Sequence, residues 1–204
     1  MPKNKHIGRL KGIGHKKRRK NLHVTFDDPN RAADFIRAHT MVLQHIKCVN
    51  PYATKHMLHL RTEYRKRGIK HPDEQLTNEH NRKFAAWFKT YMREHPLSEN
   101  DDRGTELFSL ASGPALNVTT YQAYDINGYT FYTEARDKVK GVYQNSGVTL
   151  HAYTGKEKNK HYGRIKEIWE LRYADVGIFP MFRVRWAKQV LQEDDYFTTM
   201  VIPP

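Results

Sequence analysis

Cysteine is almost absent from this chain, and long apolar runs are missing altogether. Cys48 is the single cysteine in 204 residues, which excludes an intramolecular disulfide and any metal cluster that needs several cysteines. No apolar run is long enough for a transmembrane helix, and the basic first twenty residues lack the apolar core of a secretory signal. We therefore expect no membrane among the partners of this chain.

Apolar residues are scarce, whereas aromatic residues are not. Apolar residues make up 38% of the chain, below the usual ~45–50%. Aromatic residues make up 12%, which a fully disordered chain would not have. Part of the chain is therefore expected to fold around aromatic side chains, and the apolar shortfall is expected to lie in the remainder.

Basic residues outnumber acidic residues only in the first half of the chain. Residues 1–100 contain 22 Lys and Arg against nine Asp and Glu, whereas residues 101–204 contain 13 of each. The entire formal net charge of +13 thus belongs to the first half. This asymmetry indicates a polyanionic partner, of which nucleic acid is the commonest. A solvated basic tail without a specific partner is the alternative interpretation.

The strongest local charge lies in a glycine-rich N-terminal segment. Residues 1–22 contain no acid, and mutual repulsion together with backbone entropy predicts a disordered arm. Its basic run is typical of a nuclear-import signal or of a tail that contacts phosphates. The run consists of Lys16, Lys17, Arg18, Arg19 and Lys20.

Residues 23–95 show the apolar spacing of amphipathic helices. We expect helices over roughly 30–47, 51–67 and 77–94. The sequence Asp27-Asp28-Pro29-Asn30 is typical of a helix start, and Gly68 is expected to end the second helix. Residues 96–117 are polar at first and contain Ser-Gly-Pro, so they are predicted to be a linker.

From residue 118 onward the apolar period changes to that of strands. Asn127-Gly128 between two aromatic segments is a strong hairpin signal, because both turn positions need positive φ. Residues 162–173 fit a strand, although helical spacing is also present. Residues 182–186 and 196–202 complete the set of short strands. We therefore expect an α+β chain whose residues 118–204 form a small antiparallel β-barrel or sandwich.

The sequence offers no catalytic motif. It has no phosphate-binding glycine loop and no GxSxG nucleophile elbow. The adjacent acids Asp101-Asp102 and Asp194-Asp195 are expected to be solvated, because neighbouring residues do not readily face one metal ion. The prediction is a protein that is not an enzyme and uses no cofactor.

Two further patterns allow a site but favour a structural role. His45, Cys48, His56 and His59 have the spacing of zinc ligands, yet most structural zinc sites use at least two cysteines. Surface histidines on a basic helix are the favoured interpretation, and we predict no metal site. Aromatic residues between positions 121 and 132 could form a stacking surface, but core packing is more typical of such residues. They are Tyr121, Tyr124, Tyr129, Phe131 and Tyr132.

Several segments resemble one family in their order along the chain. They are YDINGYTFYT at 124–133, QNSGV at 144–148, YGRI at 162–165, IWELRY at 168–173, and FRVRW at 182–186. Together with Pro51-Tyr52 and Trp87-Phe88 they resemble the domain of unknown function near the C-terminus of plant CACTA (En/Spm-type) transposon proteins. The resemblance implies transposon ancestry, with the catalytic acids of the transposase core lying upstream. Cys48 does not fall where the family's usual cysteine is expected.

These observations predict a nuclear accessory protein that associates with DNA without sequence preference. The residues expected to contact phosphates are the run at 16–20 together with Arg65, Lys66 and Arg67. An alternative is a protein-interaction module, in which the β-rich domain binds a transposase core or a chromatin protein. A degenerate transposon fragment without a selected function is a further alternative.

Overall fold

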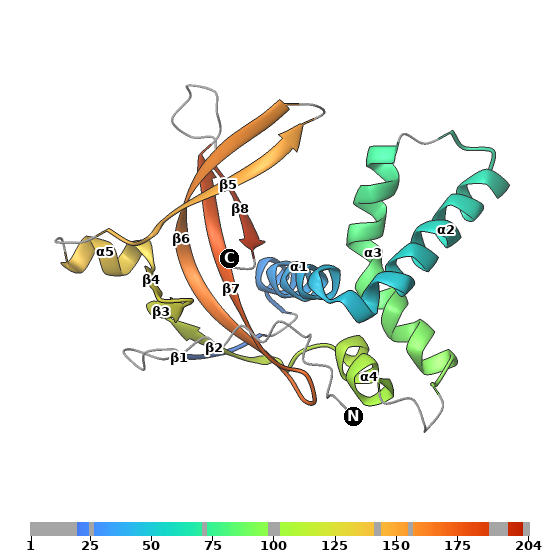
Figure 1. Ribbon diagram of the computed structural model, residues 1–204, viewed down its shortest axis with the longest axis horizontal. Coiled ribbons are helices and arrows are strands. Elements are labelled where there is room, and N and C mark those ends of the chain that lie inside the picture. Colours follow the sequence, from blue (N-terminus) through green and yellow to red (C-terminus); the bar gives the residue numbers. More distant parts are fainter. Residues whose placement is uncertain are drawn as a thin grey trace. The chain divides into compact units, whose positions relative to one another are not determined.

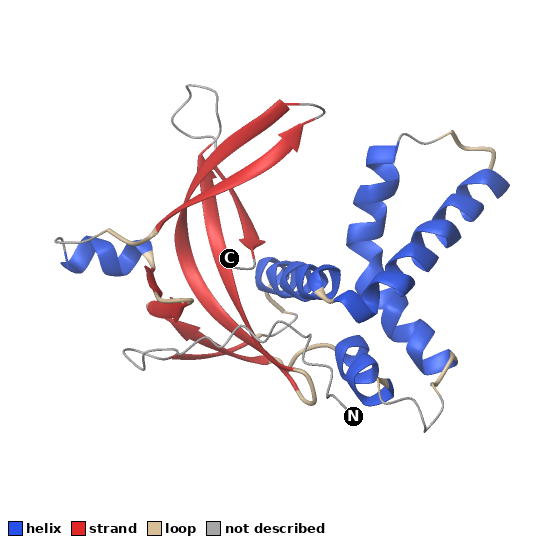
Figure 2. Ribbon diagram, in the orientation of Figure 1, coloured by secondary structure: helices blue, strands red, loops and turns tan. Residues whose placement is uncertain are grey.

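The computed structural model describes residues 20–24, 27–70, 73–97, 103–140, 144–154, 157–187 and 196–201. Its contacts divide the chain into two compact units that alternate along the sequence. Among the described residues, one unit contains Phe35–Ala115 and Arg172–Gly177, and the other contains residues 20–34, Leu116–Leu171 and the strands from Ile178 onward. The fold is α+β, with helices in the N-terminal half and antiparallel strands toward the C-terminus (Figures 1 and 2).

The predicted helices are present, and their ends lie within two residues of the expected positions except at the start of the third helix, which begins four residues earlier than expected, at Asp73. Helix α1 spans Pro29–His45, the short 3-10 helix η1 spans Lys47–Val49, α2 spans Asn50–Lys66 and α3 spans Asp73–Glu94. Asp28 caps α1 as expected, because its Oδ1 accepts hydrogen bonds from the Asn30 and Arg31 amides at 3.0 and 3.2 Å.

Helix α2 ends just before Gly68, as predicted. Gly68 has φ of 66°, which lets the chain leave the helix, and its amide bonds to the Arg65 carbonyl oxygen at 3.1 Å. The Ile69 amide donates to the Tyr64 carbonyl oxygen at 3.2 Å. These bonds satisfy carbonyl groups that the helix end would otherwise leave without donors.

Residues 96–117 contain a helix where a linker was expected. Gly104–Ser112 form α4, whose Leu107, Leu110 and Ala111 are buried. The short apolar run that the sequence places after the polar stretch is therefore one face of a helix in the first unit. Apolar side chains from α1, α2, α3 and α4 make up the core of this unit. They include Phe35, Val42, Leu43, Leu60, Leu76, Phe84, Phe88, Met92 and Leu110.

The second unit is built on an antiparallel sheet. Its strands are β1 (Lys20–His23), β2 (Asn117–Tyr121), β5 (Gly147–Thr154), β6 (Glu157–Tyr173), β7 (Gly177–Ala187) and β8 (Tyr196–Val201). Their order is β1-β2-β6-β7-β8, with β5 also paired to β6. Among the described residues no pairing joins β1 to β8, so the sheet is open and the expected closed barrel is not found.

Strand β1 forms from the end of the segment expected to be a disordered arm. Leu22 lies opposite Val118 of β2, and Val24, directly after the strand, is buried and donates its amide hydrogen to the Leu116 carbonyl oxygen at 3.0 Å. Leu22 and Val24, the two apolar residues that follow the basic run, thus attach this part of the chain to the sheet. Residues 1–19, including most of the predicted arm, lie outside the described residues.

The Asn-Gly hairpin is confirmed. Strands β3 (Ala123–Ile126) and β4 (Tyr129–Tyr132) pair as a separate two-stranded sheet, and Asn127 and Gly128 have φ of 51° and 84°. Helix α5 (Glu134–Lys140) follows this hairpin. The main hydrophobic core of the unit consists of Tyr121, Tyr124, Ile126, Ile165, Ile168, Phe182, Val184 and Trp186.

Candidate nucleic-acid interface

Helix α2 carries the predicted cationic residues on a face that its packing leaves exposed. His56 and Leu60 are the buried side chains of this helix, one turn apart. The opposite face therefore points to solvent over the length of the helix. It includes Lys55, Leu58, Arg61, Thr62, Arg65 and Lys66, all of which are exposed.

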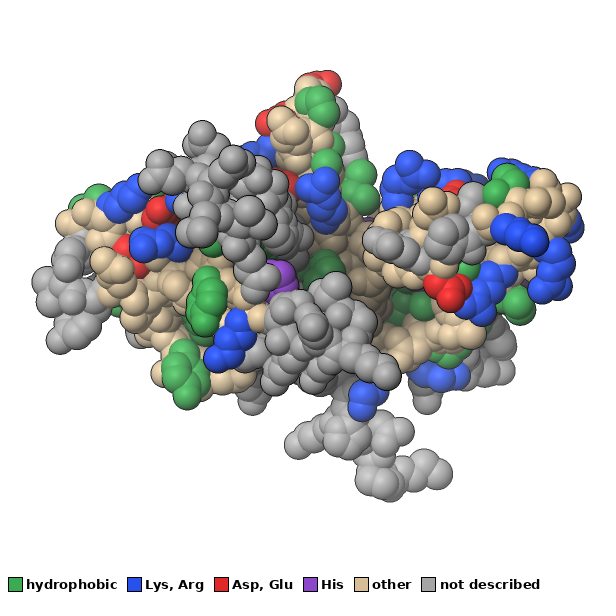
Figure 3. Space-filling view, turned by 90° about the horizontal axis from the view of Figure 1, so that it is seen from above, with side chains coloured by type: hydrophobic (Ala, Val, Ile, Leu, Met, Phe, Trp, Pro, Cys, Tyr) green, Lys and Arg blue, Asp and Glu red, His purple; other side chains and the backbone are tan. Residues whose placement is uncertain are grey.

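The cations of α2 are concentrated in its second half and in the turn that follows. Residues 50–70 contain six Lys and Arg but a single acid, whereas residues 73–94 contain four of each sign. The side chains of Arg61, Lys66 and Arg67 are 59%, 69% and 64% exposed. Figure 3 shows basic side chains gathered over the helical unit at the right of the view. Of these two helices, α2 with the turn that follows it thus carries the excess positive charge. We call its exposed cations the α2 basic face: Lys55, Arg61, Arg65, Lys66, Arg67 and Lys70.

The acids near the α2 basic face hold its cations only loosely. Glu63 lies 3.3 Å from Lys66 Nζ and 3.9 Å from an Arg67 nitrogen, and Asp73 lies 3.8 Å from Arg61. Exposed ion pairs of this kind contribute little, about 0–1 kcal/mol. A phosphate can therefore replace either carboxylate at small cost.

The structure brings together only part of the set that the sequence predicted. Arg65, Lys66 and Arg67 lie at the C-terminal end of α2, as expected. Lys16, Lys17, Arg18 and Arg19 lie outside the described residues, and Lys20 is described only as the first backbone position of β1. Sequence reasoning missed Lys55, Arg61 and Lys70 as members of the face, although the four-residue step from Arg61 to Arg65 was a signal for Arg61.

A buried histidine pair lies on the opposite side of α2. The Nδ1 atoms of His56 and His80, on α2 and α3, are 2.9 Å apart, so one ring donates and the other accepts. Burial lowers the pKa of His56 to about 4, helped by the nearby His80, His59 and Lys83, and it lowers the pKa of His80 as well. Both rings are therefore neutral at pH 7 and join the two helices.

The histidine and cysteine spacing that resembles a zinc site does not converge. His45 Nδ1 contacts the Met41 carbonyl oxygen at 2.8 Å, while Cys48 Sγ lies 3.7 Å from Glu106 Oε1. The two residues belong to different elements, α1 and η1, so one continuous helical face is never formed. Burial and Glu106 also raise the pKa of Cys48 to about 11. Within the described ranges, no group of three or more His, Cys, Asp or Glu is placed to hold a metal ion.

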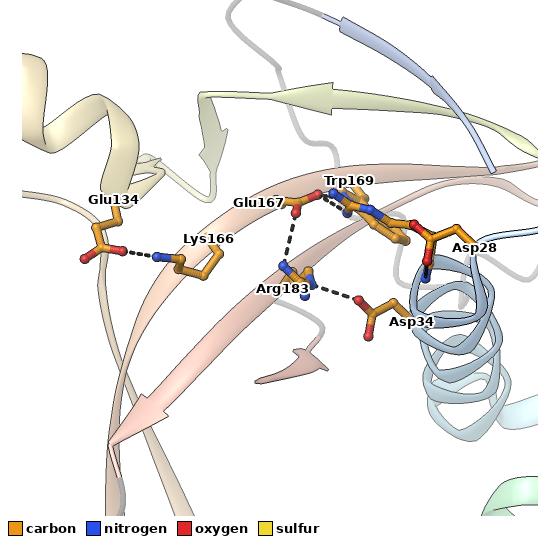
Figure 4. A network of polar contacts seen from close by, with 8 residues as sticks. Asp28, Asp34, Glu134, Lys166, Glu167, Trp169 and Arg183 are labelled. Carbon is orange, nitrogen blue, oxygen red and sulfur yellow. Dashed lines mark hydrogen bonds and ion pairs between the residues drawn. The ribbon is translucent and has the colours of Figure 1, made fainter. Parts of the chain in front are cut away.

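Carboxylates do converge in the sheet unit, but they are neutralised by cations (Figure 4). Arg183 donates to Asp34 Oδ2 at 2.8 Å and to Glu167 Oε1 at 3.1 Å, and Arg31 donates to Glu167 Oε2 at 2.6 Å. Burial opposes the charged form of Glu167, but the bonds from Arg31 and Trp169 outweigh it, and the pKa of Glu167 is lowered. This network holds the first turn of α1 against β6 and β7 and has the character of a structural contact.

A third carboxylate of the same unit is held in the same way. Lys166 donates a hydrogen bond to Glu134 at the start of α5, and Arg185 lies 3.1 Å away. These cations lower the pKa of Glu134. The Asp101-Asp102 and Asp194-Asp195 pairs lie outside the described residues.

The aromatic residues at 121–132 do not form one exposed surface. Tyr121 and Tyr124 are buried, and their hydroxyl groups donate to Glu170 at 2.9 and 2.8 Å. Phe131 packs against the core, whereas Tyr129 is 72% exposed. Tyr121, Tyr124 and Phe131 therefore agree with the favoured interpretation, in which these residues pack in the core.

Comparisons of the chain with protein-family models, with curated proteins and with solved structures found no match. The resemblance to the CACTA transposon domain therefore stays a prediction. No helix within the described part of the chain is both long and apolar enough to cross a membrane.

Proposed function

We propose that this chain is a nuclear accessory protein of transposon ancestry that associates with DNA through phosphate contacts. The observation that supports the proposal best is the α2 basic face, with six cations against one acid over residues 50–70. Lys and Arg side chains that replace condensed counterions provide affinity that does not depend on base sequence. The proposal assigns no catalytic residue and no cofactor to the chain.

Arg65, Lys66 and Arg67 are the described residues that the proposal places on phosphates. They follow one another around the last turn of α2, so their side chains spread over an arc instead of a single point. Such an arc suits the closely spaced charges of a duplex, one per ~1.7 Å of helix axis. The run at 16–20 would add further phosphate contacts from the N-terminal segment.

A binding titration of the full chain against a short DNA duplex at low salt tests the proposal. The matched variants remove three cations each, as R65A/K66A/R67A on α2 or as R82A/K89A/R93A on the exposed surface of α3. We expect the α2 variant to lose substantially more affinity than the α3 variant. Absence of binding by the unmodified chain, or equal losses in the two variants, would contradict the proposal.

Protein binding by the sheet unit is the second candidate function. Tyr129 on β4 and Val139 on α5 are 72% and 76% exposed, so both apolar side chains are accessible to a partner. A transposase core or a chromatin protein would be the partner. Capture of such a partner by the full chain, and its loss in Y129S/V139S with DNA binding unchanged, would support this function in addition to the first.

A further inference from the structure

Helix α2 has an outer ridge that is uncharged through its middle. Leu58 lies midway in sequence between the buried His56 and Leu60, so at 3.6 residues per turn it points directly away from the packed side. It is 65% exposed. Thr62 lies one turn further on the same ridge, and Arg65 continues it toward the helix end. Packing within the helical unit therefore gives no reason for a leucine at this position.

Cations lie on both flanks of this ridge. The helical period places Arg61 on one flank and Lys55 and Lys66 on the other. Lys55 Nζ is 2.5 Å from the hydroxyl oxygen of Tyr91 on α3, and Arg61 on the other flank lies 3.8 Å from Asp73 at the start of the same helix. The Leu58–Thr62 ridge thus separates two rows of positive charge along the same helix.

This arrangement matches the major groove of B-form DNA. The groove is ~12 Å wide, admits one α-helix, and is bordered on each side by a row of phosphates. A helix of 17 residues is about 25 Å long and about 10–12 Å across with its side chains, so α2 fits the groove in both dimensions. The exposed side of α3 is less suited, because residues 73–94 carry as many acids as cations.

We propose that α2 lies in the major groove, with Leu58 and Thr62 at the base edges and the flanking cations on the two phosphate rows. This inference rests on the proposed function and gives it a binding geometry. Leu58 would contact thymine methyl groups, and the Thr62 hydroxyl would accept from base amino groups. That hydroxyl already donates to the Leu58 carbonyl oxygen at 2.9 Å, so its acceptor positions are the ones available. Both contacts tolerate many sequences, which agrees with weak base preference.

The test compares three probes of one base sequence with the full chain. They are plain duplex DNA, the same duplex with glucosylated 5-hydroxymethylcytosine, and duplex RNA. Glucose fills the major groove without changing the phosphate charge, and the A-form groove of RNA is too narrow for a helix. We expect plain DNA to bind at least about fivefold more tightly than either other probe, the loss expected when one to a few base-edge contacts are removed.

Two uncharged variants separate groove contact from phosphate contact. L58A/T62A should bind plain DNA about fivefold more weakly and leave binding to the glucosylated duplex unchanged. T77A/T90A, which alters exposed positions of α3, should bind as the unmodified chain does. Equal affinity for all three probes, with R65A/K66A/R67A still weakened, would overturn the groove geometry and leave the proposed function standing. Absence of binding to every probe would overturn both.

Discussion

His56 and His80 share a hydrogen bond between their Nδ1 atoms, 2.9 Å long, across the interface of α2 and α3. Phe84 and Trp87 surround the His56 ring, with ring centroids 5.7 and 4.8 Å from its own. Protonation of the accepting Nδ1 removes the acceptor that the bond requires, and protonation of either ring brings a charge into an apolar setting. The packing of α2 against α3, which positions the α2 basic face, is therefore expected to depend on pH.

Acid is expected to destabilise the helical unit at the histidine pair. Because the pKa of folded His56 is about 4 against 6.5 when unfolded, and that of His80 is also lowered, the unfolded state binds more protons in this interval. The free energy of unfolding should fall as pH drops from about 6.5 to about 4, and the contribution of His56 is at most about 3 kcal/mol. His59, Lys83 and Glu79 face the same pair, and Lys83 opposes a further positive charge while Glu79 favours it.

Urea unfolding followed at several pH values between 7 and 4 measures this dependence. Replacing both partners, as H56L/H80L, should flatten the profile while retaining buried volume. His39, whose pKa burial lowers to about 4, would provide the slope that remains. A profile as steep as that of the unmodified chain would show that the pair does not control acid stability.

A third buried histidine, His39, leads to a prediction about Tyr173. His39 Nδ1 lies 2.8 Å from the Tyr173 hydroxyl oxygen, and both side chains are buried. Y173F removes the partner and leaves a buried nitrogen without a hydrogen bond, which costs about 1–3 kcal/mol of unfolding free energy. Y129F, at a position that is 72% exposed, should change stability little in the same denaturation experiment. Equal stability of the two variants would contradict the role given to the His39–Tyr173 bond.

Gly163 on β6 permits a close approach of two core side chains. A Cβ atom there would lie 2.5 Å from Val184 Cγ1 and 2.7 Å from Trp186 Cε3. G163A should therefore destabilise the sheet unit by about 1–3 kcal/mol, as overpacking of a core does. Gly147 on β5 has open space around the same atom, so G147A is the matched control and should be nearly neutral. Thermal unfolding of the two variants tests this difference. A large loss in G163A alone indicates a packing requirement at Gly163, whereas equal losses would indicate that alanine destabilises either strand for another reason.

Removing one carboxylate should strengthen DNA binding. Glu63 contacts Lys66 and Arg67, and E63Q frees both cations and takes one negative charge off the α2 basic face. We expect a few-fold increase in affinity at low salt, which added salt should reduce. E79Q on α3, which releases Lys83 from a similar ion pair, is expected to change affinity less. A larger gain in E79Q would place the interface on α3 instead.

Local patterns predicted elements well where one residue type forces a geometry. The Asn127-Gly128 turn and the Gly68 helix end were predictable because positive φ limits the choice of residue. Helix α4 was missed because its apolar face is only one or two turns long and follows a polar stretch. Strand β1 was missed because its partner, β2, lies about a hundred residues away in sequence. Pairing over that distance leaves no trace in a short window of sequence.

The candidate site was predictable only in part for a similar reason. Charge counts identified the basic half, and consecutive cations identified Arg65, Lys66 and Arg67. The charge difference between α2 and α3 follows from counting acids and cations over the two helices. The His56–His80 pair, in contrast, depended on the packing of two helices, and it has no sequence spacing that distinguishes it from chance.

The salt dependence of duplex binding tests the central claim most directly. Plotting the logarithm of the association constant against the logarithm of salt concentration gives a slope of about −0.9 for each neutralised phosphate. For the full chain we predict a steep negative slope, and for R65A/K66A/R67A a slope shallower by about 0.9 per lost contact. A slope that is the same in both proteins would contradict the assignment of phosphate contacts to the α2 basic face.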